Sequence, residues 1–375
     1  MTSLSPSHKL VIIAGEVSGD THGARLLEAL RLIDPNLEFE GIGGDQMVGK
    51  GLKISYHIKQ MAFMGLWEVL KHLPFIRKVF YEMLQLVRDK QPSAVVLIDY
   101  PGFNLRFAAK VKKLDIPVIY YISPQLWAWG KKRVYKIKKY VDKMLVLFPF
   151  ERDFYKGYGI DSVYVGHPLS DSHWQDVIPK TTTNRDKVLG LLPGSRHQEL
   201  EKLLPDMILT ADSMIKAGEI DRAIILKVNT ISIDHYQLYL NDQPSITIEQ
   251  ISQADFYNQL DVALVSSGTA TLETAYFQVP MVIVYRVNPL TWILGNMVVK
   301  LKNIGLVNIV AGEQIAEELL QQQFTPEKAR TALKYLLDPQ INAEIRSKML
   351  IIREKLGEPG ASDRAARVIY NLISA

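Results

Sequence analysis

The fold is indicated most directly by one stretch in the second half of the chain, Val265-Ser266-Ser267-Gly268-Thr269-Ala270-Thr271-Leu272-Glu273. A strand-like apolar run at 262–265 leads into a Ser/Gly/Thr turn, and an apolar helical pattern follows. This order predicts backbone N–H groups and hydroxyls at a helix N-terminus, which is a ready site for a diphosphate. The carboxylate of Glu273, about one helical turn further on, is placed to accept hydrogen bonds from a ribose. The alternative is an ordinary helix capped by Ser or Thr, and the stretch alone does not decide between the two.

Apolar runs typical of strands recur on both sides of this stretch. In the second half they lie at 187–192, 223–228, 246–249, 262–265 and 281–285, and in the first half at 10–14, 94–98, 118–121 and 144–147. Helical patterns separate these runs, which predicts parallel, doubly wound α/β sheets. Ligands of such sheets collect at the C-terminal ends of the strands. The motifs that directly follow the runs are therefore the candidates for function.

The chain divides at a polar segment, residues 167–184, which is rich in Ser, Thr, Asp and Pro and has no periodicity. We expect two Rossmann-like α/β domains facing across a cleft, one at 1–170 and one at 185–355. A C-terminal helix at 360–375 can pack back on the first domain. A single larger α/β domain is the alternative.

The composition is that of a globular protein, because 47% of the 375 residues are hydrophobic and 22% are charged. The chain has no cysteine, which excludes disulfides, thiolate metal sites and cysteine nucleophiles. The N-terminus lacks the basic region and apolar core of a signal peptide. No apolar run reaches the ~18–20 residues that a membrane span needs, so we expect a soluble or peripheral protein.

Several familiar catalytic motifs are missing from the sequence. It contains no H-E-x-x-H, no G-x-S-x-G and no G-x-x-x-x-G-K-[ST]. No two aspartates are separated by a single residue, so the D-x-D pattern with which many glycosyltransferases hold a metal is missing as well. We therefore expect neither a catalytic metal nor another cofactor.

A second candidate for a phosphate site ends the first strand of the second domain, at Leu191-Leu192-Pro193-Gly194-Ser195-Arg196. Gly194 and Ser195 predict a turn at which the backbone can approach a ligand. The guanidinium of Arg196 is a permanently charged fork that suits a phosphate. A plain surface arginine is the alternative, but the turn at 267–273 should lie on the same edge of the same sheet.

Titratable groups follow two strands of the first domain. The loop expected at 15–23 after the first strand contains Glu16, Ser18, Gly19, Asp20 and His22. Helix capping is the alternative role for Ser18 or Asp20. The next clear strand ends at Asp99, within Ile98-Asp99-Tyr100-Pro101-Gly102-Phe103-Asn104. An aspartate at such a strand end is well placed to act as a general base on a hydroxyl, and a structural role is the alternative.

Two stretches suggest contact with an apolar or anionic substrate. Residues 61–80 are unusually apolar, with interspersed basic residues. Core packing explains much of this pattern, and the contacts expected there with an apolar chain or a membrane are Phe63, Met64, Trp67, Leu70, Phe75 and Ile76. The motif at 123–130 includes Trp127 and Trp129 and leads into seven basic residues between 131 and 143, beginning with Lys131, Lys132 and Arg133. A basic amphipathic helix beside two tryptophans favours an anionic membrane surface. Nucleic acid is the competing partner, and the absence of any nucleic-acid motif argues against it.

Seven motifs, in order along nearly the whole chain, resemble those of the lipid-A-disaccharide synthase family. They are Ala14-Gly15-Glu16-Val17-Ser18-Gly19-Asp20, Phe63-Met64-Gly65-Leu66-Trp67-Glu68-Val69-Leu70, Ile98-Asp99-Tyr100-Pro101-Gly102-Phe103-Asn104, Ser123-Pro124-Gln125-Leu126-Trp127-Ala128-Trp129, Leu191-Leu192-Pro193-Gly194-Ser195-Arg196, Ser267-Gly268-Thr269-Ala270-Thr271-Leu272-Glu273 and Asn308-Ile309-Val310-Ala311-Gly312. Seven such motifs in sequence make the resemblance specific. One departure is Gly102, where some members have an acidic residue.

The resemblance implies a GT-B glycosyltransferase that inverts the anomeric configuration. Such an enzyme transfers 2,3-diacylglucosamine from UDP-2,3-diacylglucosamine to 2,3-diacylglucosamine 1-phosphate (lipid X), giving the β-1,6-linked lipid A disaccharide 1-phosphate and UDP. The resemblance also implies a cytoplasmic protein that is peripheral on the inner membrane. Family members can form homodimers, which this sequence does not test.

The resemblance makes Asp99 the candidate base and assigns Arg196 to the nucleotide. We expect the first domain to bind substrate through Glu16, Ser18, Gly19, Asp20, His22, Asn104, Ser123, Gln125 and Trp127. We expect the second domain to bind UDP through Gly194, Ser195, Arg196, Ser267, Gly268, Thr269, Ala270, Thr271, Glu273 and Asn308. Two rival functions stay open: another UDP-sugar enzyme of this fold, such as an epimerase or a transferase with a soluble acceptor, and a non-catalytic nucleotide- or lipid-binding protein.

Overall fold

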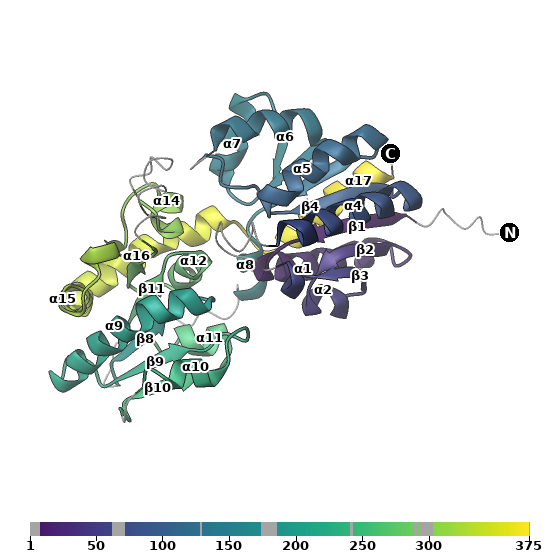
Figure 1. The fold of residues 1–375 in the computed structure, drawn as a ribbon. Helices are drawn as coiled ribbons and strands as arrows, with labels where there is room; N and C mark the ends of the chain where they lie inside the picture. Colours follow the sequence, from purple (N-terminus) through teal and green to yellow (C-terminus); the bar gives the residue numbers. More distant parts are fainter. Residues whose placement is uncertain are drawn as a thin grey trace. The chain divides into compact units, whose positions relative to one another are not determined.

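The structure is a computed structural model that describes residues 8–61, 72–127, 130–173, 186–240, 243–288, 292 and 303–374. It divides into two compact units (Figure 1). Unit 1 comprises Met1–Asp171 and Glu358–Ala375, and unit 2 comprises Ser172–Gly357. Each unit is built on its own parallel sheet, so both units have a Rossmann-like α/β fold.

The sheet of unit 1 has seven parallel strands in the order β3-β2-β1-β4-β5-β6-β7. These strands are β1 (Lys9–Ala14), β2 (Glu38–Gly43), β3 (Leu52–His57), β4 (Ala94–Ile98), β5 (Val118–Tyr121), β6 (Lys143–Val146) and β7 (Ser162–Tyr164). All five residues of β4 are buried, which is why this strand is a continuous apolar run without alternation.

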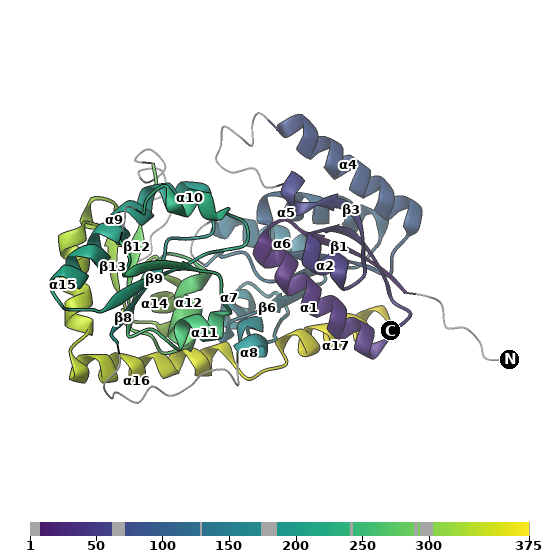
Figure 2. The same cartoon turned by 90° about the horizontal axis from the view of Figure 1, so that it is seen from below.

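Helices cover both faces of this sheet. They are α1 (Val17–Ile33), α2 (Asp45–Gly49), α4 (Leu73–Lys90), α5 (Pro101–Val111), α6 (Val134–Tyr140), α7 (Pro149–Gly157), α8 (Pro168–His173) and α17 (Ala361–Ile373). Buried residues of α4, α5 and α6 share one core with Val11 and Ile13 of β1. Helices α1 and α17 pack against each other on the opposite face (Figure 2). The two faces follow from the alternation of side chains along each strand.

The sheet of unit 2 has six parallel strands in the order β10-β9-β8-β11-β12-β13. They are β8 (Val188–Leu192), β9 (Arg222–Leu226), β10 (Ile246–Glu249), β11 (Val262–Ser266), β12 (Met281–Tyr285) and β13 (Glu317–Leu320). The helices of this unit are α9 (His197–Lys216), α10 (Ile233–Gln237), α11 (Gln253–Tyr257), α12 (Thr269–Tyr276), α14 (Leu306–Ala311), α15 (Pro326–Leu336) and α16 (Pro339–Leu356). Leucines of α9 and α15 form the core against the sheet.

One expected loop is largely helical. Residues 15–23 were predicted to be a Gly/Ser loop, but helix α1 begins at Val17, and only Gly15 and Glu16 form the turn. The glycines in this stretch serve packing instead: a Cβ on Gly23 would lie 2.5 Å from the sulfur of Met47, and one on Gly19 would touch Ala14. The prediction was wrong because close helix packing and turn formation both select glycine.

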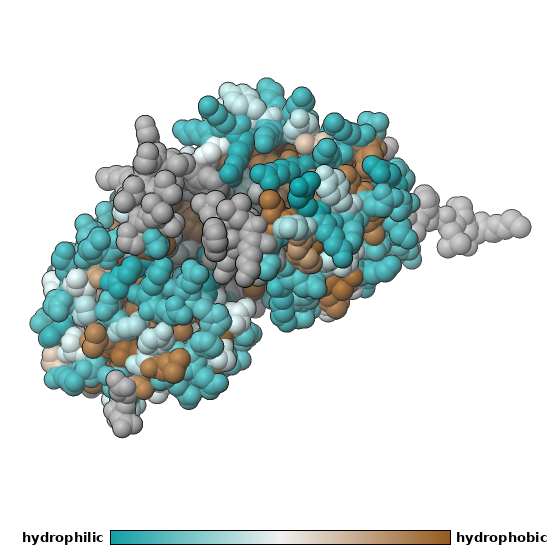
Figure 3. Space-filling view, viewed as in Figure 1, coloured by the Kyte–Doolittle hydropathy of each residue, from teal (hydrophilic) through white to brown (hydrophobic). Residues whose placement is uncertain are grey.

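No helix in the described parts of the chain is both long and apolar enough to cross a membrane. The face of the molecule in Figure 3 is mainly hydrophilic, with small scattered hydrophobic patches.

Candidate functional site

Each sheet has a point at which its strand order reverses, and the predicted motifs follow the strands at these two points. In unit 1 the chain runs from β1 through β2 to β3 and then returns to β4 on the other side of β1. In unit 2 the chain runs from β8 through β9 to β10 and then returns to β11 on the other side of β8, so the reversal lies between the neighbouring strands β8 and β11. Ligands of open α/β sheets bind at the C-terminal strand ends beside such a reversal.

At the reversal in unit 1, Ala14 lies opposite Ile98, so the turn after β1 adjoins Asp99 after β4. Asp99 and Tyr100 both have left-handed backbone conformations, with φ of 46° and 48°. Non-glycine residues in this region carry strain, which is most often found at functional sites. The conformation is held by hydrogen bonds to the carbonyl of Asp99, from Tyr120 Oη at 2.5 Å and from Asn104 Nδ2 at 2.7 Å.

The surroundings of Asp99 favour its protonated form. Burial raises the pKa of its carboxyl to about 7, and the negative charge of Glu16 acts in the same direction. A hydrogen bond with the backbone of Tyr100 opposes the rise. A carboxyl with a pKa near neutrality is suited to take a proton from a hydroxyl.

The turn before α1 is shaped by an aromatic ring. A Cβ on Gly15 would lie 2.2 Å from the ring of Tyr100, so only glycine allows this approach. Glu16 and Ser18 are exposed at the start of α1. Since Ala14 lies opposite Ile98, the turn brings Glu16 close enough for its negative charge to add to the rise in the pKa of Asp99.

Two other predicted residues of α1 lie deeper in unit 1. The buried carboxylate of Asp20 accepts hydrogen bonds from the N–H groups of Gly44, Gln46 and Met47, at 2.7, 3.1 and 3.0 Å. These bonds fix the N-terminus of α2, which favours a positioning role for Asp20. Burial lowers the pKa of His22 to about 4, so its ring is neutral near pH 7.

The loop after β5 carries three predicted substrate residues. Ser123 is buried and its hydroxyl lies 2.8 Å from that of Tyr155, whereas Gln125 is exposed. The indole Nε1 of Trp127 donates to Glu151 Oε1 at 3.3 Å. Burial raises the pKa of Glu151 to about 7. Sequence reasoning missed Glu151, although its position just after the run at 144–147 could have indicated it.

In unit 2, Leu192 lies opposite Val265, so the turn at 193–196 and the turn at 267–271 follow neighbouring strands. Gly194 has a φ of 113°, and a Cβ there would meet the carboxylate of Glu199 at 2.2 Å. Glu199 accepts from the N–H of Ser195 at 3.0 Å and from Arg196 Nη1 at 3.4 Å. The side chain of Arg196 is 45% exposed, which leaves it accessible to a ligand.

The turn after β11 leads into α12 without a side-chain cap on the described helix. Gly268 has a φ of 154° and open space around it. The hydroxyl of Ser267 donates to the carbonyl of Ile304 at 3.2 Å, and that of Thr271 donates to the carbonyl of Gly268 at 2.8 Å. Thr269 is exposed and Ala270 half-buried. The hydroxyls of Ser267 and Thr271 thus shape the turn, and the space beside Gly268 stays open.

The remaining two predicted UDP residues differ in their surroundings. Glu273 is half-buried and accepts from Gln253 Nε2 at 2.8 Å and from Tyr257 Oη at 3.3 Å. Gln253 and Tyr257 belong to α11, and the sequence analysis did not single them out. Asn308 is fully buried, and its amide bonds to the backbone of Ile315 and Ala316 and to Glu318. These bonds favour a structural role for Asn308 beneath the site.

The basic segment forms a short 3-10 turn, Lys131–Arg133, followed by α6. Lys131, Lys132 and Lys136 are exposed, Arg133 is half-buried, and Tyr135 is 64% exposed. Of the expected acyl contacts, Phe75 and Ile76 are half-buried and pack on the core of unit 1. Phe63, Met64, Trp67, Leu70 and Trp129 lie outside the described residues.

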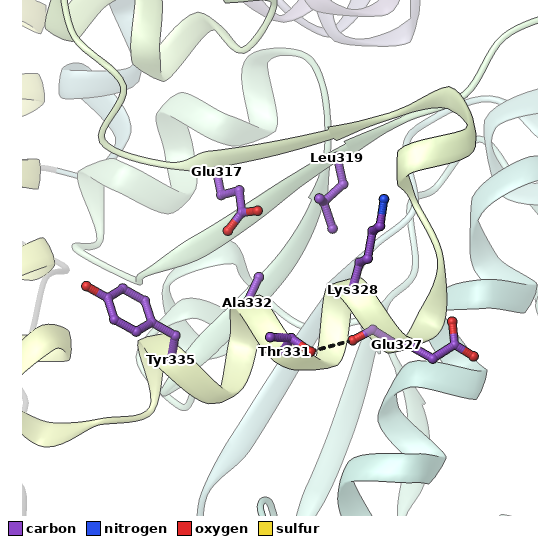
Figure 4. Close-up of a pocket in the computed structure, with 7 residues that line it drawn as sticks. All are labelled: Glu317, Leu319, Glu327, Lys328, Thr331, Ala332 and Tyr335. Atoms are coloured by element: carbon purple, nitrogen blue, oxygen red, sulfur yellow. Dashed lines mark hydrogen bonds between the residues drawn. The ribbon is translucent and has the colours of Figure 1, made fainter.

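A cavity of about 460 Å³ lies elsewhere in unit 2, between β13 and α15. Its lining includes Leu319, Lys328 and Tyr335 (Figure 4) and none of the predicted site residues. Among the described residues no cluster of three or more His, Asp or Glu side chains could hold a metal ion.

Comparisons with known sequences place these features in a family. A family model described as lipid-A-disaccharide synthetase matches residues 10–369. Curated proteins named lipid-A-disaccharide synthase align over nearly their full length. The protein from Trichlorobacter lovleyi is 37% identical over 97% of both chains, and that from Myxococcus xanthus is 35% identical over 97% of both.

Solved structures with the same fold are much more distant in sequence. The UDP-GlcNAc 2-epimerase of Neisseria meningitidis, solved with UDP-GlcNAc, superposes with a TM-score of 0.66 at 12% identity, over 97% of this chain and 100% of that one. MurG of Acinetobacter baumannii superposes with a TM-score of 0.58 at 13% identity, over 98% and 100% of the two chains. At these identities the likeness shows the fold alone.

Proposed function

The chain belongs to the lipid-A-disaccharide synthase family, and from this premise we propose how its residues carry out the family's reaction. The chain is a glycosyltransferase that joins 2,3-diacylglucosamine from its UDP donor to 2,3-diacylglucosamine 1-phosphate. The products are the β-1,6-linked disaccharide 1-phosphate and UDP. The observation that carries the proposed mechanism is Asp99, a strand-end residue with a left-handed backbone whose pKa is raised by burial to about 7.

We assign the acceptor to unit 1. Its 6-hydroxyl attacks the anomeric carbon of the donor while the carboxylate of Asp99 takes the hydroxyl proton. A single displacement of this kind inverts the configuration at that carbon. Burial, assisted by the negative charge of Glu16, raises the pKa of Asp99 to about 7, which suits proton transfer.

We assign the donor's diphosphate to unit 2. As the bond to UDP breaks, negative charge develops on the departing phosphate oxygens. The guanidinium of Arg196 and the backbone N–H groups at the start of α12 stabilise this charge. The carboxylate of Glu273, oriented by Gln253 and Tyr257, accepts from the ribose. With these groups at the leaving phosphate, the mechanism requires no metal ion.

This assignment is tested by turnover of the purified donor and acceptor pair. For Asp99→Asn, kcat should fall by about 10²- to 10⁴-fold, since that is the usual contribution of a general base. For Arg196→Ala, the Kd of UDP should rise roughly tenfold or more, because a charge-assisted contact is lost. Asp153→Asn, at an exposed position on α7, is the control. A near wild-type kcat in Asp99→Asn would refute the assignment of the base, and an unchanged Kd of UDP in Arg196→Ala would refute that of the diphosphate site.

We also propose that unit 1 binds the cytoplasmic face of the inner membrane through the exposed cations of the basic segment. Charge reversal of Lys131, Lys132 and Lys136 should weaken binding to vesicles that contain anionic lipid, each lysine contributing ~1 kcal/mol. Reversal of the exposed Lys90, Lys110 and Lys113 is the matched control. Equal loss of vesicle binding in both triple variants would show that binding depends on net charge and not on this segment.

A homodimer remains a prediction, and light scattering of the purified protein would test it.

A further inference from the structure

Glu151 lies in the first turn of α7 and is 2% exposed, which is unusual for a carboxylate. Its Oε2 accepts from the N–H groups of Leu147 and Phe148, at 3.1 and 3.2 Å. Its Oε1 accepts from the indole Nε1 of Trp127 at 3.3 Å. The two oxygens thus connect the first turn of α7 to the loop that follows β5.

The loop held in this way is the one that carries Ser123, Gln125 and Trp127. Next to Glu151, the Ser123 hydroxyl is bonded to Tyr155 Oη at 2.8 Å and to the carbonyl of Pro124 at 2.9 Å. The ring of Trp127 also packs edge-on against Phe150, with centroids 5.2 Å apart. Helix α7 therefore contacts the loop through Glu151, Tyr155 and Phe150.

We propose that Glu151 is a positioning residue for the acceptor: its carboxylate fixes the loop at 123–127 in the conformation that binds the acceptor sugar. The inference rests on the proposed function, because it takes unit 1 as the acceptor unit. Glu151 acts through Trp127 and does not itself touch the substrate.

A simpler role for Glu151 is that of a helix cap. A Glu or Gln at the third position of a helix commonly accepts the N–H of the N-cap residue, as Glu151 does from Phe148. A cap uses one oxygen only and is usually exposed. A helix cap does not require the buried bond between the second oxygen of Glu151 and the indole of Trp127.

Glu151→Gln separates the two roles. Glutamine retains the capping interaction, because its amide oxygen can accept from Leu147 and Phe148. Its NH₂ group would then face the indole N–H of Trp127, and two donors cannot bond to each other. The loop should shift while the helix cap remains.

The experiment is steady-state kinetics with each substrate varied in turn. For Glu151→Gln we expect the KM of the acceptor to rise about tenfold, with the KM of the UDP donor within twofold of wild type. Trp127→Phe should raise the acceptor KM similarly. The double variant should be no worse than either single variant, because both remove the same contact. Asp153→Asn on the same helix is the control.

Three results would overturn the inference. These are wild-type kinetics in Glu151→Gln, a fall in kcat with both KM values unchanged, and additive effects of the two substitutions. Failure of the proposed function is distinct from all three, since the wild-type protein would then form no disaccharide. Because glutamine preserves the helix cap, Glu151→Gln should fold like the wild type, and the kinetic test does not require a variant that loses the cap.

Discussion

At the scale of residues, two carboxylates in unit 1 lie where the protonated form is favoured. Burial is the largest cause for both Asp99 and Glu151, and it raises the pKa of each to about 7. Backbone N–H groups donate to the charged form and limit the rise. This balance keeps each pKa close to neutrality, where a small change of surroundings alters the charge.

The pH dependence of kcat/KM follows from the raised pKa of Asp99. A base must be deprotonated to act, so kcat/KM should rise with pH through about 7 and level off above it. In Glu16→Gln a negative charge beside Asp99 is removed, which should move this rise to lower pH. The measurement is the pH profile of both proteins. An unchanged midpoint in Glu16→Gln would contradict the placement of Glu16 beside Asp99.

At the scale of elements, helix α17 is fixed to unit 1 by a carboxylate far away in sequence. Asp171 accepts from the N–H groups of Gly360, Ala361 and Ser362 and from the hydroxyl of Ser362, at 2.7 to 3.1 Å. These bonds satisfy donors at the helix N-terminus that would otherwise lack partners. Helix α17 then packs along α1, whose N-terminal turn carries Glu16.

Asp171→Asn should therefore destabilise unit 1 by about 2 kcal/mol, because a charged cap with several partners is replaced by a neutral one. Amide protons of α17 should exchange faster with solvent in this variant. Asp363→Asn, at an exposed position in the first turn of the same helix, is the control. Equal effects of the two substitutions on urea unfolding would contradict the role of Asp171.

At the scale of the whole molecule, the sequence predicts the buried strands and misses the atypical ones. Strands β4 and β11 are apolar throughout and are evident from the sequence. Strand β2 contains Gly41 and Gly43 and resembles a loop. A Cβ on Gly41 would lie 1.9 Å from the carbonyl oxygen of Ile12, so the neighbouring strand requires glycine there. Such a requirement comes from tertiary contact, which local propensity does not register.

The same distinction applies to the candidate site. Asp99 could be identified because it directly follows a recognisable strand, and Arg196 because it lies in the turn after another. Glu151 and Gln253 were missed, since the role of each depends on a partner 24 or 20 residues away in the sequence, namely Trp127 and Glu273. Conversely, Asp20 carries the right chemistry for a ligand, but its carboxylate is bonded to the backbone of α2.

The central claim is tested most directly by the product that the purified chain makes from UDP-2,3-diacylglucosamine and 2,3-diacylglucosamine 1-phosphate. Mass spectrometry quantifies the disaccharide and UDP, and proton NMR gives the configuration of the new linkage. The account predicts equal amounts of UDP and tetraacyl disaccharide 1-phosphate, with a β linkage to the 6-position. A donor that is epimerised or hydrolysed without disaccharide, or an α linkage, would contradict it.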